Sequence, residues 1–547
     1  MKRFLVPAVF TTFVSVVFAI LAPLALAQAP APKVTLNGLF DQVTSAGRNF
    51  YDGDLTRDND REWYARTRFR PDFTFEVGRV KAVLGLEIDI GWGQMGANDG
   101  GFPGNTTGAN QCKVNSNGCF DLNTDVGGMI EIKWMYTEFP LTGKDSVLPF
   151  IPVETMARAG AQPFASLANY KIVYANGDFA GVSAITRFTP DFRTNLAYAI
   201  IEDQLAGGNR AAATARTSRG EDYAFIVSPE ITPFKGLDIK PLFSWLHADG
   251  VTASAARHHV VDRRFAGGAN TTTNSGASLG GGNAAGDSTF HEDRYTIGFD
   301  ARWRSGPFGF EPTIYYQWGQ RDHMAVRTNG TVGKVEADMS SWIVDLIGSF
   351  QTGPLLLEVR GAYSPGNKAR DNLARSVRYF QQLDEDGNYW NNWAALLANG
   401  GIDYFNGTLL TNMGRHIGYD RYGRAALGFK ATYSITPALA VYTWVSPNWT
   451  AEKVDTDTGA GAGTGASAVS RTTLDDQSWV EGDSRYLGTE IDIGTTWRFA
   501  PNAAFDLQGA YLFAGEALGT AEVLSGVHTR RDPNDGYMIA ARVRFAF

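Results

Sequence analysis

The chain has 547 residues, of which 44% are hydrophobic and 12% aromatic, with 61 glycines and a formal net charge of −8. The acidic balance lacks the basic footprint of a nucleic-acid-binding protein. After the N-terminal region, no run approaches the roughly 20 apolar residues that a membrane-spanning helix needs. Short segments of alternating polarity, separated by Gly, Pro, Asn and Asp, predict an all-β fold, and no linker marks a domain boundary.

Residues 1–27 have the pattern of a secretory signal peptide. Lys2 and Arg3 precede an apolar run from Phe4 to about Leu24, and the small residues of Ala25-Leu26-Ala27 suit a cleavage site. The length of the run would also suit a membrane anchor. The cleavage site and the Pro-rich AQAPAP that follows favour removal. We therefore expect an exported protein with one mature domain at 28–547.

Segments with strand-like alternation follow one another along the mature chain. They are Val34–Val43, Tyr64–Val77, Val80–Trp92, Val126–Phe139, Val153–Pro163, Tyr170–Ala175, Ala180–Phe188, Thr194–Ile201, Tyr223–Ile231, Leu237–Leu246, Arg294–Trp303, Phe308–Trp318, Trp342–Gln351, Leu355–Tyr363, Tyr422–Tyr433, Leu439–Trp449, Tyr486–Phe499, Ala504–Phe513 and Tyr537–Phe547. Single-chain bacterial barrels usually have even strand numbers, so one segment between Val153 and Ile231 should be wrong. The sequence predicts a transmembrane antiparallel up-and-down β-barrel of about 18 strands, within a range of roughly 16–20.

The connections alternate between short and long. Short turns are expected at Gly78, Pro233–Gly236, Ser305–Pro307, Thr352–Pro354, Thr436-Pro437 and Ala500–Ala503. Long connections are expected at Thr44–Asp60, Gly93–Asp125, His247–Asp293, Arg321–Ser340, Ser364–Arg421, Thr450–Arg485 and Ala514–Gly536. This asymmetry predicts short periplasmic turns and long extracellular loops.

The two cysteines, Cys112 and Cys119, lie close together in the sequence CKVNSNGC. In an exported chain this spacing predicts a local disulfide. A metal or haem site is the alternative, but no Cys-x-x-Cys-His occurs and no histidine is near either thiol. The seven histidines are scattered, and the motifs of hydrolases, metalloproteases and phosphate-binding loops are missing from the sequence. We therefore predict no catalytic residues, no metal site and no cofactor.

Family resemblance comes from the C-terminal part. The terminal Phe547 resembles the closing signature of bacterial outer-membrane β-barrels, which the barrel assembly machinery recognises. The motifs LGTEIDIG at 487–494 and GAYLFAGEAL at 509–518 resemble the penultimate hairpin of alginate-export-like and related porin barrels, and GAYSPGN at 361–367 and ARAGAQ at 157–162 resemble strand exits of that group. The resemblance implies a Gram-negative outer-membrane porin that contacts lipids and lipopolysaccharide, and it leaves a homo-oligomer open.

Alternation also predicts which charged side chains face the lumen. The predicted pore-lining residues are Arg66, Arg68, Arg70, Glu87, Asp89, Arg302, Arg304, Arg542 and Arg544. Closure places the last strand beside the first, so five of these arginines and two carboxylates should share one wall. Such a wall would favour anionic solutes. Mutual pairing of the charges is the alternative.

The connection 364–421 contains a candidate constriction. Trp390, Trp393, Leu396 and Leu397 have helical spacing, followed by Gly400-Gly401 as a stop. An apolar helical face is unfavourable in water, so we expect it to fold against the barrel mouth or into the lumen. Contact with lipopolysaccharide or a neighbouring subunit is the alternative.

The functional prediction is a channel in the outer membrane for passive or facilitated diffusion of small polar solutes, with anions favoured. One alternative is a structural or export barrel, which would export polysaccharide or form a sheath for a periplasmic partner. Another is a channel for hydrophobic substrates. Nucleic acid is not an expected partner, and an enzymatic role has little support in the sequence.

Overall fold

The computed structural model describes residues 30–49, 55–56, 61–91, 120–121, 125–127, 130–163, 170–171, 173–175, 178–202, 222–250, 290–326, 332–368, 371, 376–383, 390, 393–397, 422–454, 456, 482–524 and 527–547. The predicted signal peptide and both cysteines lie outside these residues. Within them, no helix is long and apolar enough to cross a membrane.

Across the described ranges, 18 antiparallel strands form one closed barrel. The strands are β1 (Lys33–Arg48), β2 (Arg61–Val77), β3 (Val80–Gly91), β6 (Ile130–Thr142), β7 (Glu154–Pro163), β8 (Asp178–Thr189), β9 (Phe192–Glu202), β10 (Asp222–Phe234), β11 (Leu237–Gly250), β12 (Phe290–Ser305), β13 (Phe308–Val326), β14 (Val332–Thr352), β15 (Leu355–Ser364), β17 (Arg424–Thr436), β18 (Leu439–Val454), β19 (Ser484–Ala500), β20 (Ala503–Ala514) and β23 (Gly536–Ala546). Each pairs with the next along the chain. The predicted fold class is therefore confirmed.

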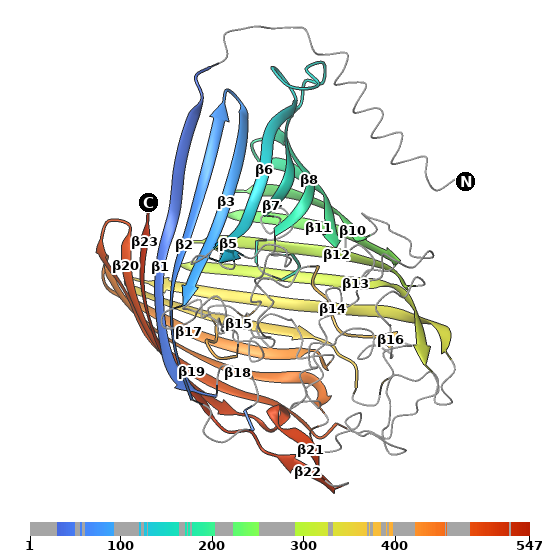
Figure 1. The fold of residues 1–547 in the computed structure, drawn as a ribbon, viewed down its shortest axis with the longest axis vertical. Coiled ribbons are helices and arrows are strands. Elements are labelled where there is room, and N and C mark those ends of the chain that lie inside the picture. The colour runs from blue at the N-terminus through green and yellow to red at the C-terminus, as the bar shows by residue number, and fades with distance from the viewer. Residues whose placement is uncertain are drawn as a thin grey trace.

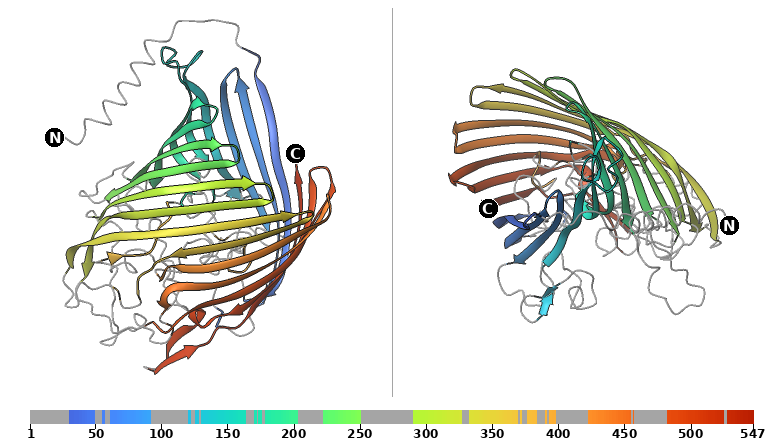
Figure 2. Two further views of the ribbon diagram at one scale, coloured as in Figure 1. Left: turned by 180° about the vertical axis from the view of Figure 1, so that it is seen from behind. Right: turned by 90° about the horizontal axis from the view of Figure 1, so that it is seen from above.

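The barrel closes between its first and last strands. β23 pairs antiparallel with β1, from Arg48 opposite Tyr537 to Leu39 opposite Ala546. Phe547 continues this pairing, since its N–H donates to the Gly38 carbonyl at 3.0 Å and its carbonyl accepts from the Gly38 N–H at 2.9 Å. Figure 1 shows the C-terminus beside β1, and Figure 2 shows the curved sheet from two further sides.

Alternation along the strands separates an apolar outer face from a polar inner face. On β19, Ile491 and Ile493 are 43% and 68% exposed on the outside, whereas Glu490 and Asp492 are fully buried on the inside. The closing strand follows the predicted pattern, with Ile539, Val543 and Phe545 facing outward. Because the strand period is two, the inner set is fixed once one face is placed in an apolar environment.

Two predictions about the strands are wrong. The described residues of the predicted strand Tyr170–Ala175, which are 170–171 and 173–175, form no strand and lie inside the barrel, and this accounts for the one surplus segment. The long connection predicted at Arg321–Ser340 is mostly strand, because β13 and β14 pair as far as Val326 opposite Val332. Their outer ends carry polar residues such as Gln320 and Asp338, so the apolar signal that marks a membrane-spanning strand stops before the strands do.

The other elements are small and lie among the long connections. They are the paired strands β4 (Phe120–Asp121) and β5 (Asp125–Gly127), the strand β16 (Ser376–Val377), the paired strands β21 (Thr520–Leu524) and β22 (Val527–Arg531), and the 3-10 helix η3 (Glu516–Leu518). β16 pairs parallel with β14. The predicted short turns all join strands at the opposite end of the barrel, with Gly78, Gly236, Gly306 and Gly353 at positive φ.

The seam between β1 and β23 generates a prediction about stability. A Cβ atom on Gly38 would lie 2.6 Å from Cζ of Phe547 and 2.7 Å from the Arg70 carbonyl oxygen. We expect Gly38→Ala to lower the thermal midpoint of the detergent-solubilised barrel, because overpacking typically costs about 1–3 kcal/mol. Gly509→Ala is the matched control, since the nearest atom to its Cβ would be 4.0 Å away. Equal midpoints for the two variants would contradict the seam's tight packing.

Candidate functional site

The first part of the site is a charged wall on the inner face of five adjacent strands. It consists of Glu87 on β3, Arg66, Arg68 and Arg70 on β2, Asp41 on β1, Arg542 and Arg544 on β23, and Asp506 on β20. The strands are hydrogen-bonded neighbours in this order. Columns of negative and positive charge therefore alternate around the wall.

Ion pairs join these columns. Glu87 contacts Arg68 at 3.0 Å and Arg70 at 3.1 Å, and Arg66 approaches Asp41 at 3.9 Å. On the other side of β1, Asp506 contacts Nε of both Arg542 and Arg544, at 3.1 and 2.8 Å. The arginines predicted for this wall do come together, and each of them lies close to a carboxylate.

Asp41 and Asp506 were missing from the predicted set, and they change the charge of the wall. Both occupy positions whose side chains face inward, so the alternation of their strands could have identified them. The backbone of Asp89 lies opposite Arg68 in the register, and the structure describes only the backbone of Asp89. The wall thus carries two carboxylates more than the predicted set contains.

The other two predicted arginines lie elsewhere on the inner face. Arg302 on β12 stacks over the ring of Tyr170 at 4.4 Å and donates to the Tyr170 carbonyl at 2.9 Å. Arg304 lies near the β12–β13 turn, where it pairs with Glu311 at 2.5 Å. Neither belongs to the charged wall. Arg302 instead helps to hold the segment around Tyr170, which is predicted as a strand but does not form one.

The described residues of that segment, 170–171 and 173–175, are anchored inside the barrel by inward-facing carboxylates of β12 and β14. Asp300 accepts the backbone N–H groups of Tyr170 and Lys171 at 2.7 and 2.9 Å. Nζ of Lys171 contacts Asp345 at 3.1 Å, and the Tyr174 hydroxyl donates to Ser244 at 2.8 Å. These bonds satisfy backbone and side-chain groups that would otherwise be buried without partners, which is why the segment can stay in the lumen without a strand neighbour.

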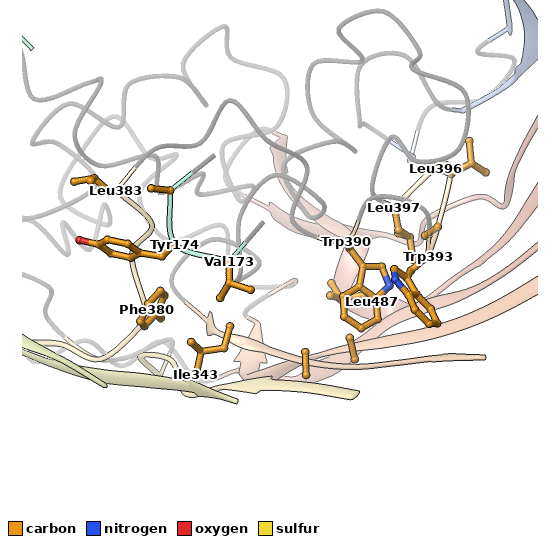
Figure 3. Close-up of a cluster of buried hydrophobic side chains, with 14 of the residues drawn as sticks. Val173, Tyr174, Ile343, Phe380, Leu383, Trp390, Trp393, Leu396, Leu397 and Leu487 are labelled. Atoms are coloured by element: carbon orange, nitrogen blue, oxygen red, sulfur yellow. The ribbon is translucent and has the colours of Figure 1, made fainter. Parts of the chain in front are cut away.

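A second inward segment comes from the connection between β15 and β17. Glu490 on β19 accepts three consecutive backbone N–H groups, from Ala395, Leu396 and Leu397, at 2.6, 2.7 and 2.8 Å. The Trp390 indole donates to Ser446 at 2.8 Å. Figure 3 shows the two tryptophans and two leucines of the predicted constriction grouped beside the barrel strands. All four side chains are buried, and the constriction predicted for them stays a prediction.

The helix predicted for this stretch is wrong for the residues that the structure describes. Trp390 and residues 393–397 form turns, with one hydrogen bond from the Trp393 N–H to the Trp390 carbonyl at 3.1 Å. In an α-helix the Leu397 N–H would bond to the Trp393 carbonyl. Here the Glu490 carboxylate accepts the Leu397 N–H and the two N–H groups before it, from Ala395 and Leu396. A buried carboxylate on a facing strand has therefore replaced the helical partners, and spacing alone could not reveal it.

Residues 380–383, from the same connection between β15 and β17, contact the first inward segment. The Leu383 N–H donates to the Tyr174 carbonyl at 2.8 Å, and the ring of Phe380 lies 6.4 Å from that of Tyr174. Gln381 joins this layer to the barrel, because it exchanges two hydrogen bonds with Gln317, at 2.9 and 3.0 Å. Tyr174, Phe380 and Leu383 belong to the same buried hydrophobic cluster as Trp390 and Leu397, and this cluster forms a layer against the inner face of the barrel.

Arginines border the layer on the barrel side. Arg360 on β15 lies 4.4 Å from the ring centre of Trp390 and pairs with Asp345 at 2.6 Å. Arg424 on β17 lies 5.1 Å from the same ring. Cationic and aromatic groups therefore share the surface between the segments and the strands. The side chains of Arg360, Arg424 and Trp390 are all buried, so these contacts hold the layer against the strands.

Comparison with known proteins finds likenesses only among solved structures. OccK8 (OprE) of Pseudomonas aeruginosa matches with a TM-score of 0.44 and 11% identity, over 94% of this chain and 98% of that one. A BenF-like porin from Pseudomonas fluorescens Pf-5 matches with 0.45 and 11%, over 94% and 98%. Acinetobacter baumannii OccAB4 matches with 0.43 and 8%, over 96% and 100%.

No family model and no curated protein sequence matches the chain. The likeness of the C-terminal motifs to alginate-export-like barrels therefore gains no support from these comparisons. At such low identity and TM-score, the structural likenesses leave the function to be argued from the chain's own residues.

The Glu490 anchor generates a prediction. In Glu490→Ala, three buried N–H groups lose their acceptor, and each unsatisfied group costs about 1–3 kcal/mol. We expect the inward segment to leave its position and the single-channel conductance in planar bilayers to rise. Glu452→Ala is the control, because Glu452 is partly exposed and pairs only weakly with Arg485, at 3.4 Å. A folded Glu490→Ala barrel that conducts like wild type and the control would show that the anchor does not narrow the lumen.

Proposed function

We propose that the protein is an outer-membrane channel that lets small polar solutes, including anions, diffuse down their gradient. One observation carries the proposal: a closed sheet has an apolar outer face and a charged inner face. A closed barrel leaves no unpaired sheet edge, which makes it one of the two structures that can span a hydrocarbon layer. The outer face supplies the apolar band that lipid requires, and the inner face supplies the polar wall of a water-filled passage.

The position in the cell follows from the N-terminal sequence and the chain's topology. The signal-like residues 1–27 favour export, and β-barrels of this kind belong to the outer membrane of Gram-negative bacteria. The short turns would face the periplasm and the long connections the exterior. Lipids and lipopolysaccharide would surround the barrel, and the barrel assembly machinery would insert it.

The inward segments favour small solutes over polymers. Residues 170–171 and 395–397 are tied by several hydrogen bonds to inward-facing carboxylates, Asp300 on β12 and Glu490 on β19. Export of a polysaccharide or enclosure of a folded partner would need a wide, clear lumen. A layer of anchored segments suits a narrow passage in which each solute meets the wall.

The charged wall would supply the selectivity. Arg68 and Arg70 keep 12% and 31% of their side-chain surface exposed, whereas Arg66 is completely buried. Screening lengths of about 8 Å at physiological salt are comparable with the spacing of these side chains, so neighbouring charges act together. The exposed arginines would attract anionic groups, and the carboxylates beside them would limit the net preference.

Bilayer recordings test the proposal and its charge dependence together. The purified protein should give stepwise conductance. Arg68→Gln/Arg70→Gln removes the two cations nearest to Glu87, which keeps Lys133 at 3.8 Å, so the reversal potential in a salt gradient should shift toward cations. Glu87→Gln should shift it toward anions. Both shifts should shrink at high salt, because screening weakens the wall's field.

Arg66 is best left intact in this experiment, since removing one partner of a buried ion pair costs about 3–5 kcal/mol and would threaten folding. A folded wild-type barrel without conductance would overturn the channel. Unchanged reversal potentials at low salt in both variants would show that the charges of the wall pair with one another and do not select between ions.

The topology can be tested on intact cells. An epitope inserted at Gly463, in the connection between β18 and β19, should bind antibody from outside. One inserted at Ser305-Gly306, in the β12–β13 turn, should bind only after the outer membrane is permeabilised. As a control, an immunoblot should show that the two insertion variants are expressed at the same level. Reversed accessibility would show that the short turns face the exterior.

A further inference from the structure

A cluster of two histidines and one aspartate lies on the outer face of the barrel. His247 on β11 stands directly opposite Asp293 on β12 in the strand register. His291 precedes Asp293 by two positions and therefore lies on the same face. The intervening Glu292 and Arg294 are buried on the inner face, which places the cluster on the outside.

The position along the strands is at the end with the long connections. β11 ends at Gly250 and β12 begins at Phe290, so the cluster lies within a few residues of both strand ends. The next outward pair, Trp245 opposite Tyr295, has stacked rings 6.3 Å apart. Aromatic rows of this kind mark the boundary between lipid and water. The cluster is thus on the aqueous side of an aromatic row.

The donor atoms converge. Nδ1 of His247 lies 2.8 Å from Oδ1 of Asp293, and Nε2 of His291 lies 3.1 Å from Oδ2 of the same carboxylate. One ligand atom from each residue lies within 4.8 Å of the other two. The side chains of His247, His291 and Asp293 are 19%, 39% and 31% exposed, so solvent reaches them.

Trp245 provides an outer partner for the carboxylate. Its indole N–H donates to Oδ1 of Asp293 at 2.8 Å. Carboxylate ligands of metals are usually held by such hydrogen bonds, which fix their orientation. The three residues also project from two paired strands, so their spacing is set by the strand register and not by a loop.

We propose that His247, His291 and Asp293 form a binding site for a divalent transition metal ion of the zinc class. Two imidazole nitrogens and one carboxylate oxygen suit Zn²⁺, Ni²⁺ or Cu²⁺, whereas Ca²⁺ and Mg²⁺ prefer oxygen ligands. Water would fill the remaining positions on the open side. The site is independent of the lumen and of the proposed channel function.

Calorimetric titration of the purified, detergent-solubilised full chain with ZnCl₂ at pH 7.5 tests the site. We expect saturable binding of one ion per chain at these residues. In His247→Ala/His291→Ala the corresponding heat should disappear. Trp245→Phe keeps an aromatic ring but removes the N–H donor, so the affinity should fall by about 10–100-fold, as it does when other residues that hydrogen-bond a metal ligand are changed. Melting curves by circular dichroism would establish that each variant is folded.

His528→Ala provides the control, because it removes a histidine from the distant strand β22 and should leave the affinity unchanged. Two results would overturn the proposal. One is a wild-type chain that shows no saturable Zn²⁺ binding. The other is binding that persists with the same affinity and stoichiometry in the folded double variant, which would place the ion elsewhere and leave the cluster as a hydrogen-bonded trio.

Discussion

Closure of the sheet is the constraint on which the rest of the structure depends. A strand with an unpaired edge would expose a row of N–H and C=O groups, which neither lipid nor a neighbouring side chain can satisfy. Pairing of β23 with β1 removes that edge, and the two bonds between Gly38 and Phe547 extend it to the last residue. Once the ring is closed, the strand period assigns every side chain to the outer or the inner face.

The same requirement to satisfy backbone groups governs what lies inside the barrel. A segment that enters the lumen brings N–H groups without strand partners. Inward carboxylates meet this need at two places, where Asp300 binds the N–H groups of residues 170–171 and Glu490 binds those of residues 395–397. Carboxylates can do this because an ionised carboxylate accepts several hydrogen bonds at once. The polar inner face is thus a set of anchoring points as well as a surface for solutes.

Sequence reasoning succeeded where one strand or one turn carries its own signal. The alternation in Tyr537–Phe547, the glycine turns and the even strand number together predicted the barrel. It failed where a partner from a distant strand decides the outcome. Tyr170–Ala175 alternates like a strand but binds Asp300, and the stretch at 390–397 has helical spacing but gives its N–H groups to Glu490. The cluster around Asp293 was also missed, because His247 and Asp293 lie 46 positions apart.

The charged wall and the inward segments have a consequence when considered together. Neighbouring strands are about 4.8 Å apart, so columns of opposite charge alternate over distances shorter than the screening length of about 8 Å. Their fields cancel a short way from the wall, and a solute in the middle of a wide lumen would be little affected. Glu490 lies on β19, which pairs with β20, the strand that carries Asp506. A Cβ atom on Gly536 of β23 would lie 3.7 Å from Leu396. The segment that Glu490 anchors therefore borders the wall. Selectivity would arise there, because a solute must pass close enough to meet individual charges before they cancel.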